Sequence, residues 1–140
     1  MLLHIVARGR IGRGPEAELV QRYLDRVAWP TRVTELPDKV GRVPAAPSSL
    51  ATIILDEKGP ALGSMAFAER LGRWRDDGMR EARFLIGAAD GFSDAERADS
   101  DLLLGFGAMT WPHLLARAML AEQLWRATSI LAGHPYHREG

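Results

Sequence analysis

Two glycine-containing loops are the first candidates for binding chemistry in this 140-residue chain. One occupies residues 87–91, after an apolar run at 82–86, and the other occupies residues 105–112, after an apolar run at 102–104. Small residues leave backbone amides and carbonyls accessible, and ligands of open α/β sheets bind at the carboxyl ends of the strands. The two loops therefore predict a site for a flat cofactor, although two ordinary tight turns would have the same pattern.

The C-terminal sequence HPYHRE, residues 134–139, is the second candidate. It combines two imidazoles, a phenol and a guanidinium in one short segment. Such groups can stack on a nucleic-acid base and neutralise a phosphate. A terminal segment that frays is the alternative interpretation.

The charge composition argues against a protein that coats nucleic acid by bulk charge. The chain has 18 Lys and Arg and 18 Asp and Glu, and its formal net charge is +0. A local basic patch is compatible with this balance, because Arg8, Arg10 and Arg13 lie in a loop without an acid among them. The patch predicts phosphate contacts, and a solvated basic loop is an equally good interpretation.

Residue types and spacing exclude several other kinds of site. Cysteine is absent, which excludes disulfides, thiolate nucleophiles and Cys-ligated zinc. The chain has no phosphate-binding GK[ST] sequence and no GxSxG hydrolase sequence, and its first glycine loop does not match GxGxxG. His134 and His137 form only an i, i+3 pair, so we expect no metal site.

The elements that must position these candidates follow from apolar runs that alternate with helical patterns. This alternation is typical of a parallel α/β sheet. Strands are expected at 2–7, 31–36, 51–55, 82–86 and 102–104. Helices are expected at 15–28, at 64–77 with Ser64 as N-cap, after a Ser93/Glu96 capping box, and from about 112 to before Gly133.

Length and hydropathy set the organisation. A chain of 140 residues predicts a single domain, 1–140. No apolar run approaches the roughly 20 residues of a membrane span, so we expect a cytoplasmic protein without a membrane partner. The last helix is apolar on more than one face. We expect its apolar faces to pack against the sheet on one side and a second subunit on the other. The alternative is that its own chain covers all of them.

Four sequence segments together resemble the ribosomal RNA large subunit methyltransferase H family, a member of the SPOUT superfamily. The resemblance extends from LLHIVA at 2–7 nearly to the terminus, and its motifs are FLIGAADG at 84–91, AMTWPH at 108–113, AEQLWRA at 121–127 and HPYHRE at 134–139. It implies a three-layer parallel-sheet α/β fold with a C-terminal deep trefoil knot, in a homodimer. It also implies transfer of a methyl group from S-adenosylmethionine to N3 of a pseudouridine in helix 69 of the large-subunit (23S) ribosomal RNA.

The resemblance also assigns site residues by position. From the chemistry of the implied reaction, the catalytic candidates are His137 and Arg138, either of which would place a cation near the base from the same or the neighbouring subunit, and Glu122 and Arg126 are expected to form a structural pair across the dimer. The S-adenosylmethionine contacts would be Leu55, Gly87, Ala88, Gly107, Ala108, Met109, Thr110, Trp111 and Pro112.

Two departures from the family pattern motivate a competing interpretation. The family usually has GGPEG where this chain has GAADG at 87–91, so Ala88 replaces a glycine that can take positive φ. Residues 37–49 are short and proline-rich where the family has a further helix. The alternative is a non-catalytic ribosome-associated or RNA-binding knotted dimer. A generic flavodoxin-like nucleotide-binding module is a third interpretation.

Overall fold

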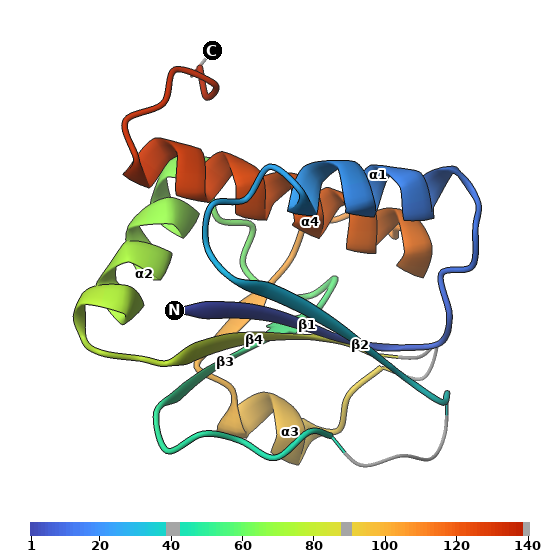
Figure 1. Ribbon diagram of the computed structural model, residues 1–140. Helices are drawn as coiled ribbons and strands as arrows, with labels where there is room; N and C mark the ends of the chain where they lie inside the picture. The colour runs from blue at the N-terminus through green and yellow to red at the C-terminus, as the bar shows by residue number, and fades with distance from the viewer. Residues whose placement is uncertain (39–42, 88–90, 139–140) are drawn as a thin grey trace.

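A parallel β-sheet forms the centre of the computed structural model, which describes residues 1–38, 43–87 and 91–138 (Figure 1). Its five strands lie in the order β2-β1-β4-β3-β5, and every neighbouring pair is parallel. The strands are β1 (Leu2–Arg8), β2 (Thr31–Leu36), β3 (Leu50–Leu55), β4 (Glu81–Ile86) and β5 (Leu102–Leu104). The predicted α/β class and the positions of all the predicted strands are confirmed.

Helices cover both faces of this sheet, which gives three layers (Figure 1). Three helices lie on one face, and the short α3 lies on the other together with the segment before β3. The helices are α1 (Pro15–Leu24), α2 (Ser64–Asp76), α3 (Asp94–Asp99) and α4 (His113–Leu131). Parallel strands must be connected by crossovers, and this arrangement buries the central strands on both sides.

Two predicted helix ends need correction, and one cap is confirmed. The first helix ends at Leu24 instead of residue 28, because the chain leaves the helix in a turn that directs it toward β2. The N-cap of α2 is Gly63, and the Ser64 hydroxyl instead donates a hydrogen bond to Gln123 Oε1 at 2.8 Å. The Ser93/Glu96 capping box of α3 is present as predicted.

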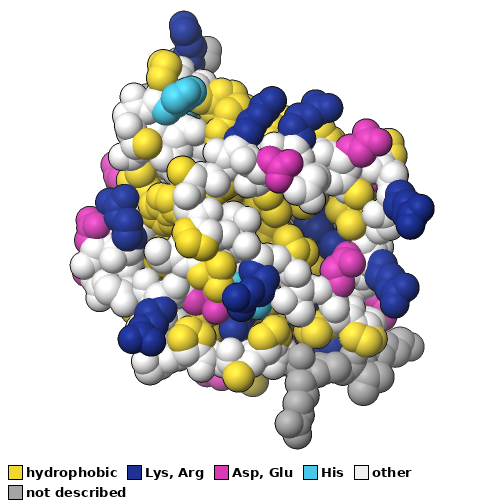
Figure 2. Space-filling model, viewed as in Figure 1, with side chains coloured by type: hydrophobic (Ala, Val, Ile, Leu, Met, Phe, Trp, Pro, Cys, Tyr) yellow, Lys and Arg dark blue, Asp and Glu magenta, His cyan; other side chains and the backbone are white. Residues whose placement is uncertain are grey.

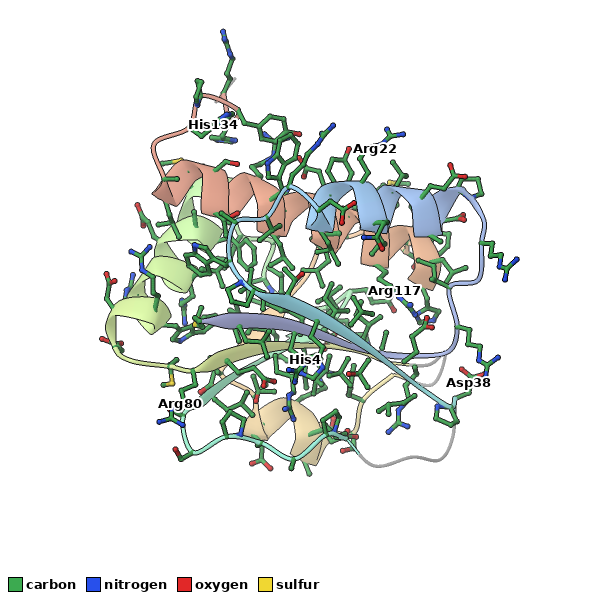
Figure 3. The ribbon with its side chains drawn as sticks, in the orientation of Figure 1. His4, Arg22, Asp38, Arg80, Arg117 and His134 are labelled. Carbon is green, nitrogen blue, oxygen red and sulfur yellow. The ribbon has the colours of Figure 1, made fainter. Side chains whose placement is uncertain are left out.

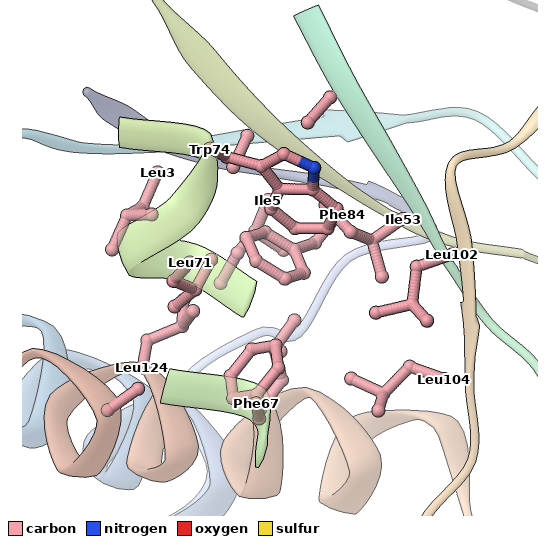
Figure 4. Packing of buried hydrophobic residues seen from close by; sticks show 14 of the residues in the cluster. Leu3, Ile5, Ile53, Phe67, Leu71, Trp74, Phe84, Leu102, Leu104 and Leu124 are labelled. Carbon is pink, nitrogen blue, oxygen red and sulfur yellow. The ribbon is translucent and has the colours of Figure 1, made fainter. Parts of the chain in front are cut away.

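The hydrophobic core lies between the sheet and α1, α2 and α4 (Figure 4). Side chains at alternate positions of β1 and β4 point to this face, as the two-residue period of a strand requires. Phe84 is fully buried there, and its ring meets that of Phe67 edge to face with 6.1 Å between centroids. The large members of the cluster are Leu3, Ile5, Ile53, Phe67, Leu71, Trp74, Phe84, Leu102, Leu104, Leu120 and Leu124.

The opposite face of the sheet holds a buried polar cluster around His4 (Figure 3). Glu81 Oε2 receives the Arg83 Nε–H at 2.5 Å and lies 3.0 Å from His4 Nδ1, and His4 Nε2 lies 2.7 Å from Thr34 Oγ1. Burial would raise the pKa of Glu81, but the hydrogen bonds from Arg83 and His4 outweigh it and lower that pKa. Burial lowers the pKa of His4 more than its Glu81 contact raises it. Each group is therefore held by its neighbours, as buried polar groups must be.

The last helix, α4, packs against α1 and α2 as well as the sheet, which explains its apolar faces from within one chain. Leu120, Ala121 and Leu124 are completely buried there. The second subunit that was the other predicted cover stays a prediction. Within the described ranges, no helix is both long enough and apolar enough to cross a membrane.

Candidate functional site

A cavity of about 430 Å³ lies at the carboxyl edge of the sheet, where β3, β4 and β5 end. Its volume falls in the range of roughly 300–1,000 Å³ that is typical of small-molecule sites. The apolar part of its wall is formed by Leu55, Ile86, Phe92, Leu104 and Phe106, and the polar part by Asp56, Glu57, Lys58, Arg97, Thr110 and His113. The cavity therefore offers a flat apolar surface with charged groups at its margin.

Glycines let the backbone form this wall at close range. A Cβ at Gly105 would lie 2.6 Å from the Gly59 carbonyl oxygen, so no larger residue fits between the two loops. A Cβ at Gly87 would lie 2.9 Å from the Phe92 ring. Gly107 has φ +105 and faces open space, a conformation that favours glycine. Gly87 and Gly91, together with the loop at 105–112, therefore line the cavity.

Polar contacts join segments that are far apart in sequence across the cavity. Arg97 Nε lies 2.8 Å from Asp56 Oδ2, which ties α3 to the loop after β3. The Thr110 hydroxyl donates to Glu57 Oε2 at 3.1 Å, and the Trp111 indole donates to the Phe106 carbonyl at 3.2 Å. The Thr110 contact holds the loop after β5 against the loop after β3, and the Trp111 contact closes the loop after β5 on itself.

The C-terminal segment folds back onto the second half of α4. The Tyr136 ring lies on Trp125 with 3.7 Å between centroids. Glu122 Oε1 accepts hydrogen bonds from the Tyr136 hydroxyl at 3.0 Å and from Arg126 Nε at 2.9 Å. His137 Nδ1 lies 3.1 Å from the Arg126 guanidinium. The tail is thus docked by stacking and by a carboxylate that Tyr136 shares with Arg126.

This carboxylate also changes the titration of its partners. The hydrogen bond to Glu122 raises the pKa of Arg126. Burial raises the pKa of the Tyr136 phenol, and the Glu122 hydrogen bond raises it further. Glu122 and Arg126 pair within one helix turn of the same chain, and the pairing across a dimer stays a prediction. An i, i+4 spacing places the two side chains together on one helix face.

Comparison with known proteins matches this arrangement to one family over almost the whole chain. A family described as "Predicted SPOUT methyltransferase" matches residues 1–137. The chain belongs to this SPOUT methyltransferase family. A protein of Rhizorhabdus wittichii named ribosomal RNA large subunit methyltransferase H is 75% identical over 140 residues, which cover 100% of each chain.

Other relatives carry the same name at lower identity. The Sphingopyxis alaskensis protein is 67% identical over 140 residues, with 100% of this chain and 99% of that protein covered. The Paramagnetospirillum magneticum protein is 48% identical over 151 residues, with 99% of each covered. The similarity is therefore of full length, and the resemblance identified from the motifs is confirmed.

In this SPOUT methyltransferase the predicted cofactor residues gather at one place. Leu55, Gly87, Gly107, Thr110 and Trp111 line the cavity. The remaining described positions, Ala108, Met109 and Pro112, belong to the same loop but not to the cavity wall, and Met109 is 76% exposed. Ala88 lies outside the described residues.

The structure adds residues that sequence reasoning missed. Asp56, Glu57 and Lys58 line the cavity, but no motif distinguished them from a solvated turn. Arg97 was part of a helix interpreted only through its capping box. A signal was available for Asp56 to Lys58, since they follow a buried strand at the sheet edge where ligands bind.

The predicted catalytic residues of the SPOUT methyltransferase lie elsewhere in the same chain. The cavity borders His113, the first residue of α4, whereas the tail docks at Glu122 and Arg126. At 1.5 Å rise per residue this places the tail's anchor points about 14 to 20 Å along the helix. No group of His, Asp and Glu side chains suited to a metal occurs in the part of the chain that the structure describes.

Proposed function

We propose that this chain transfers the methyl group of S-adenosylmethionine to N3 of a pseudouridine in helix 69 of the large-subunit ribosomal RNA. The observation that carries the proposal is the cavity at the carboxyl edge of the sheet, which collects residues from both glycine loops. The full-length relatives named ribosomal RNA large subunit methyltransferase H support the choice of substrate. A cytoplasmic location follows, since that is where ribosomes are found.

The residues that line the cavity fit S-adenosylmethionine. Gly105 packs too closely against Gly59 for any side chain, and a Cβ at Gly107 would point into open space, so the loop leaves room beside the cavity for a flat ligand. Leu55 and Phe106 supply apolar surface for the flat ring system. The Glu57 carboxylate suits a cationic ligand by charge. When bound, S-adenosylmethionine supplies a methyl group on a positively charged sulfur.

The fit extends the proposal to the loop around Ala88. Gly87 precedes it and closes against Phe92, and Gly91 after it has φ +71. We propose that Ala88, which lies outside the described residues, is compatible with cofactor binding, and calorimetric titration with S-adenosylmethionine tests this.

A homodimer would complete the site. Within one chain the tail and the cavity lie at different positions along α4, so His137 and Arg138 are remote from the methyl donor. A second copy could bring its tail to the cavity of the first. The proposed active site is therefore composite, with the cofactor held by one protomer and the tail contributed by its partner. The deep trefoil knot implied by the family resemblance belongs to the same proposal.

The tail residues would have different tasks in this composite site. Methylation at N3 requires loss of the imide proton, so a cation near the base favours the anionic form that attacks the methyl group. The exposed guanidinium of Arg138 suits that role. His137 is half-buried and lies against Arg126, and its Nε2 is buried without a hydrogen-bond partner among the residues that the structure describes. Docking of Tyr136 and His137 on α4 would hold Arg138 in position.

The test is methyl transfer to ribosomes that lack this modification. The purified protein and S-adenosylmethionine are incubated with them, and the helix 69 fragment is weighed after digestion of the ribosomal RNA. We expect a gain of one methyl group on the pseudouridine. No gain, together with no binding of S-adenosylmethionine by calorimetry, would instead support the non-catalytic RNA-binding dimer.

A variant tests the role of Arg138 separately. Arg138→Ala is expected to reduce the rate of methyl transfer by about 100-fold, the scale of one electrostatic contact to a transition state, with little effect on cofactor affinity. Cofactor affinity is measured by calorimetry and the rate by single-turnover methylation. Equal losses in both would contradict the catalytic role.

A further inference from the structure

The largest fully buried side chain of the protein is an arginine that takes no part in the cavity. Arg117 projects from α4 and is only 1% exposed. Its NH1 donates to Glu35 Oε2 at 2.5 Å, and its NH2 donates to the Gly9 carbonyl at 3.2 Å. Figure 3 shows Arg117 between α4 and the sheet, on the side where the loop between β1 and α1 lies. A buried guanidinium that reaches this loop calls for an explanation, since burying a charge is costly.

Its partner Glu35 is an ionised carboxylate at the carboxyl end of β2. The same Oε2 accepts a hydrogen bond from the Ile11 backbone amide at 2.8 Å. Burial would raise the pKa of Glu35, but the hydrogen bonds from Arg117 and Ile11 outweigh it, and the charge of Arg10 lowers that pKa further. Arg10 is therefore close enough to attract the Glu35 carboxylate, which already forms an ion pair with Arg117.

The loop that these contacts anchor carries the basic patch of Arg8, Arg10 and Arg13. Arg10 and Arg13 are exposed, and neither has an ion pair with a described residue. Gly9 with φ +88 and Gly12 with φ +73 shape the turn. Figure 2 shows basic side chains that stand out at the right-hand edge of the molecule, where Figure 1 places this loop.

The basic loop also lies beside the proposed cofactor site. Strand β1 is the sheet neighbour of β4, with Ala7 opposite Ile86. The chain after β1 therefore leaves the sheet next to the chain after β4, where Gly87 lines the cavity. Cations at this position can reach the phosphates of an RNA whose base is directed to the cavity.

We propose that Arg117 is a positioning residue that sequesters the Glu35 carboxylate, so that Arg10 and Arg13 remain available to bind ribosomal RNA phosphates beside the target base. This inference rests on the proposed function. Without Arg117, Glu35 would be left unpaired beside Arg10 and would attract it away from the RNA. The Arg117 contact to the Gly9 carbonyl also fixes the start of the loop.

The direct test is the double variant Arg10→Gln/Arg13→Gln, assayed by methylation of unmodified ribosomes at several KCl concentrations. We expect KM for ribosomes to rise about tenfold, with kcat and calorimetric S-adenosylmethionine affinity retained. The plot of log affinity against log salt should become less steep by about 1.5, the value for two lost phosphate contacts. Arg73→Gln is the matched control and should change neither quantity, because Arg73 is exposed on α2 and its side chain has no hydrogen-bond or ion-pair partner among the described residues.

The positioning role of Arg117 is tested by rescue. Arg117→Met should raise KM for ribosomes to the same extent, because Glu35 is then free to pair with Arg10. Adding Glu35→Gln to that variant removes the competing carboxylate and should restore most of the affinity. Thermal unfolding and cofactor binding, measured on the same samples, identify any variant that fails to fold.

Each outcome decides between explanations. If the wild-type protein does not methylate ribosomes, the proposed function fails before the inference is tested. If it does, and the Arg10/Arg13 variant has a wild-type KM, the phosphate contacts are refuted. Hydroxyl-radical footprinting measures how well the wild-type and Arg10/Arg13 variant proteins protect the ribosomal RNA from cleavage. A raised KM with unchanged protection would assign these arginines to a ribosomal protein and overturn the proposal. A folded Arg117→Met/Glu35→Gln variant that is not rescued would overturn the role of Arg117.

Discussion

The closest backbone approach in the cavity makes Gly105→Ala the most quantitative test of the site. The new Cβ would lie 2.6 Å from the Gly59 carbonyl oxygen and 3.0 Å from that of Asp56, whereas ordinary contacts begin at 3.4 Å. Both neighbours are backbone atoms, so no side-chain rotation can relieve the overlap. The two loops must therefore separate by about 0.8 Å, a distance large enough to disturb hydrogen bonds to a bound ligand.

The expected cost follows from overpacking in a rigid setting. Inserting a methyl group into a packed region lowers the free energy of unfolding by about 1–3 kcal/mol, and we expect the upper end here because the backbone itself must move. For a chain of this size, about 3 kcal/mol lowers Tm by about 10 °C. A loss of only half that energy from ligand binding would weaken S-adenosylmethionine affinity about tenfold.

Calorimetric titration with S-adenosylmethionine and thermal unfolding measure the two effects. The control is Gly63→Ala, in the connection between β3 and α2 that also carries Gly59, where a Cβ meets nothing within 4 Å. It should change stability by no more than about 1 kcal/mol and leave cofactor affinity intact. A Gly105→Ala protein with the wild-type Tm and the wild-type affinity would show that the two loops do not form the cofactor site.

Three further predictions concern stability. The pKa of His4 is lowered in the folded protein, so the unfolded chain binds a proton first as pH falls below about 6.5. The free energy of unfolding should then drop by at most about 1.4 kcal/mol per pH unit. His4→Gln should remove this pH dependence, which denaturant titrations at several pH values measure. Phe84→Ala should cost about 3–5 kcal/mol in urea unfolding, since the ring is fully buried, and a cost below about 1 kcal/mol would contradict the described packing. Tyr136→Phe keeps the ring on Trp125 but loses the hydrogen bond from the hydroxyl to Glu122, so the tail is held less firmly on α4. Carboxypeptidase should therefore cleave the tail several-fold faster, and an unchanged cleavage rate would contradict this role of the hydroxyl.

Local patterns in the sequence predicted most of the fold. The apolar runs at 2–7, 51–55 and 82–86 appear as β1, β3 and β4, because a strand buried on both faces must be apolar nearly throughout. The capping box at Ser93 was predictable because its two hydrogen bonds join residues three positions apart. The end of α1 at Leu24 was not, since the turn toward β2 depends on where that strand must lie.

The site was predictable only in part, for the same reason. Both glycine loops were identified, because small residues after buried strands are a local signal that the topology converts into a cavity. The charged residues of the cavity were not, because Asp56 and Arg97 are brought together only when α3 packs beneath the sheet. The pairing of Glu122 with Arg126 within one chain was not predicted, although its i, i+4 spacing is a helical signal.

What the sequence by itself determined is therefore the local structure, the family motifs and the absence of cysteine chemistry. Tertiary structure decided which side chains meet: Arg117 with Glu35, 82 positions apart, and Tyr136 with Glu122, 14 positions apart. The sequence shows where an arginine or a glutamate lies along the chain, but it does not show which group that side chain will contact. Partners meet only when the crossovers place strands and helices in one order, because a charge that is then buried must be compensated by the polar groups that the fold brings beside it.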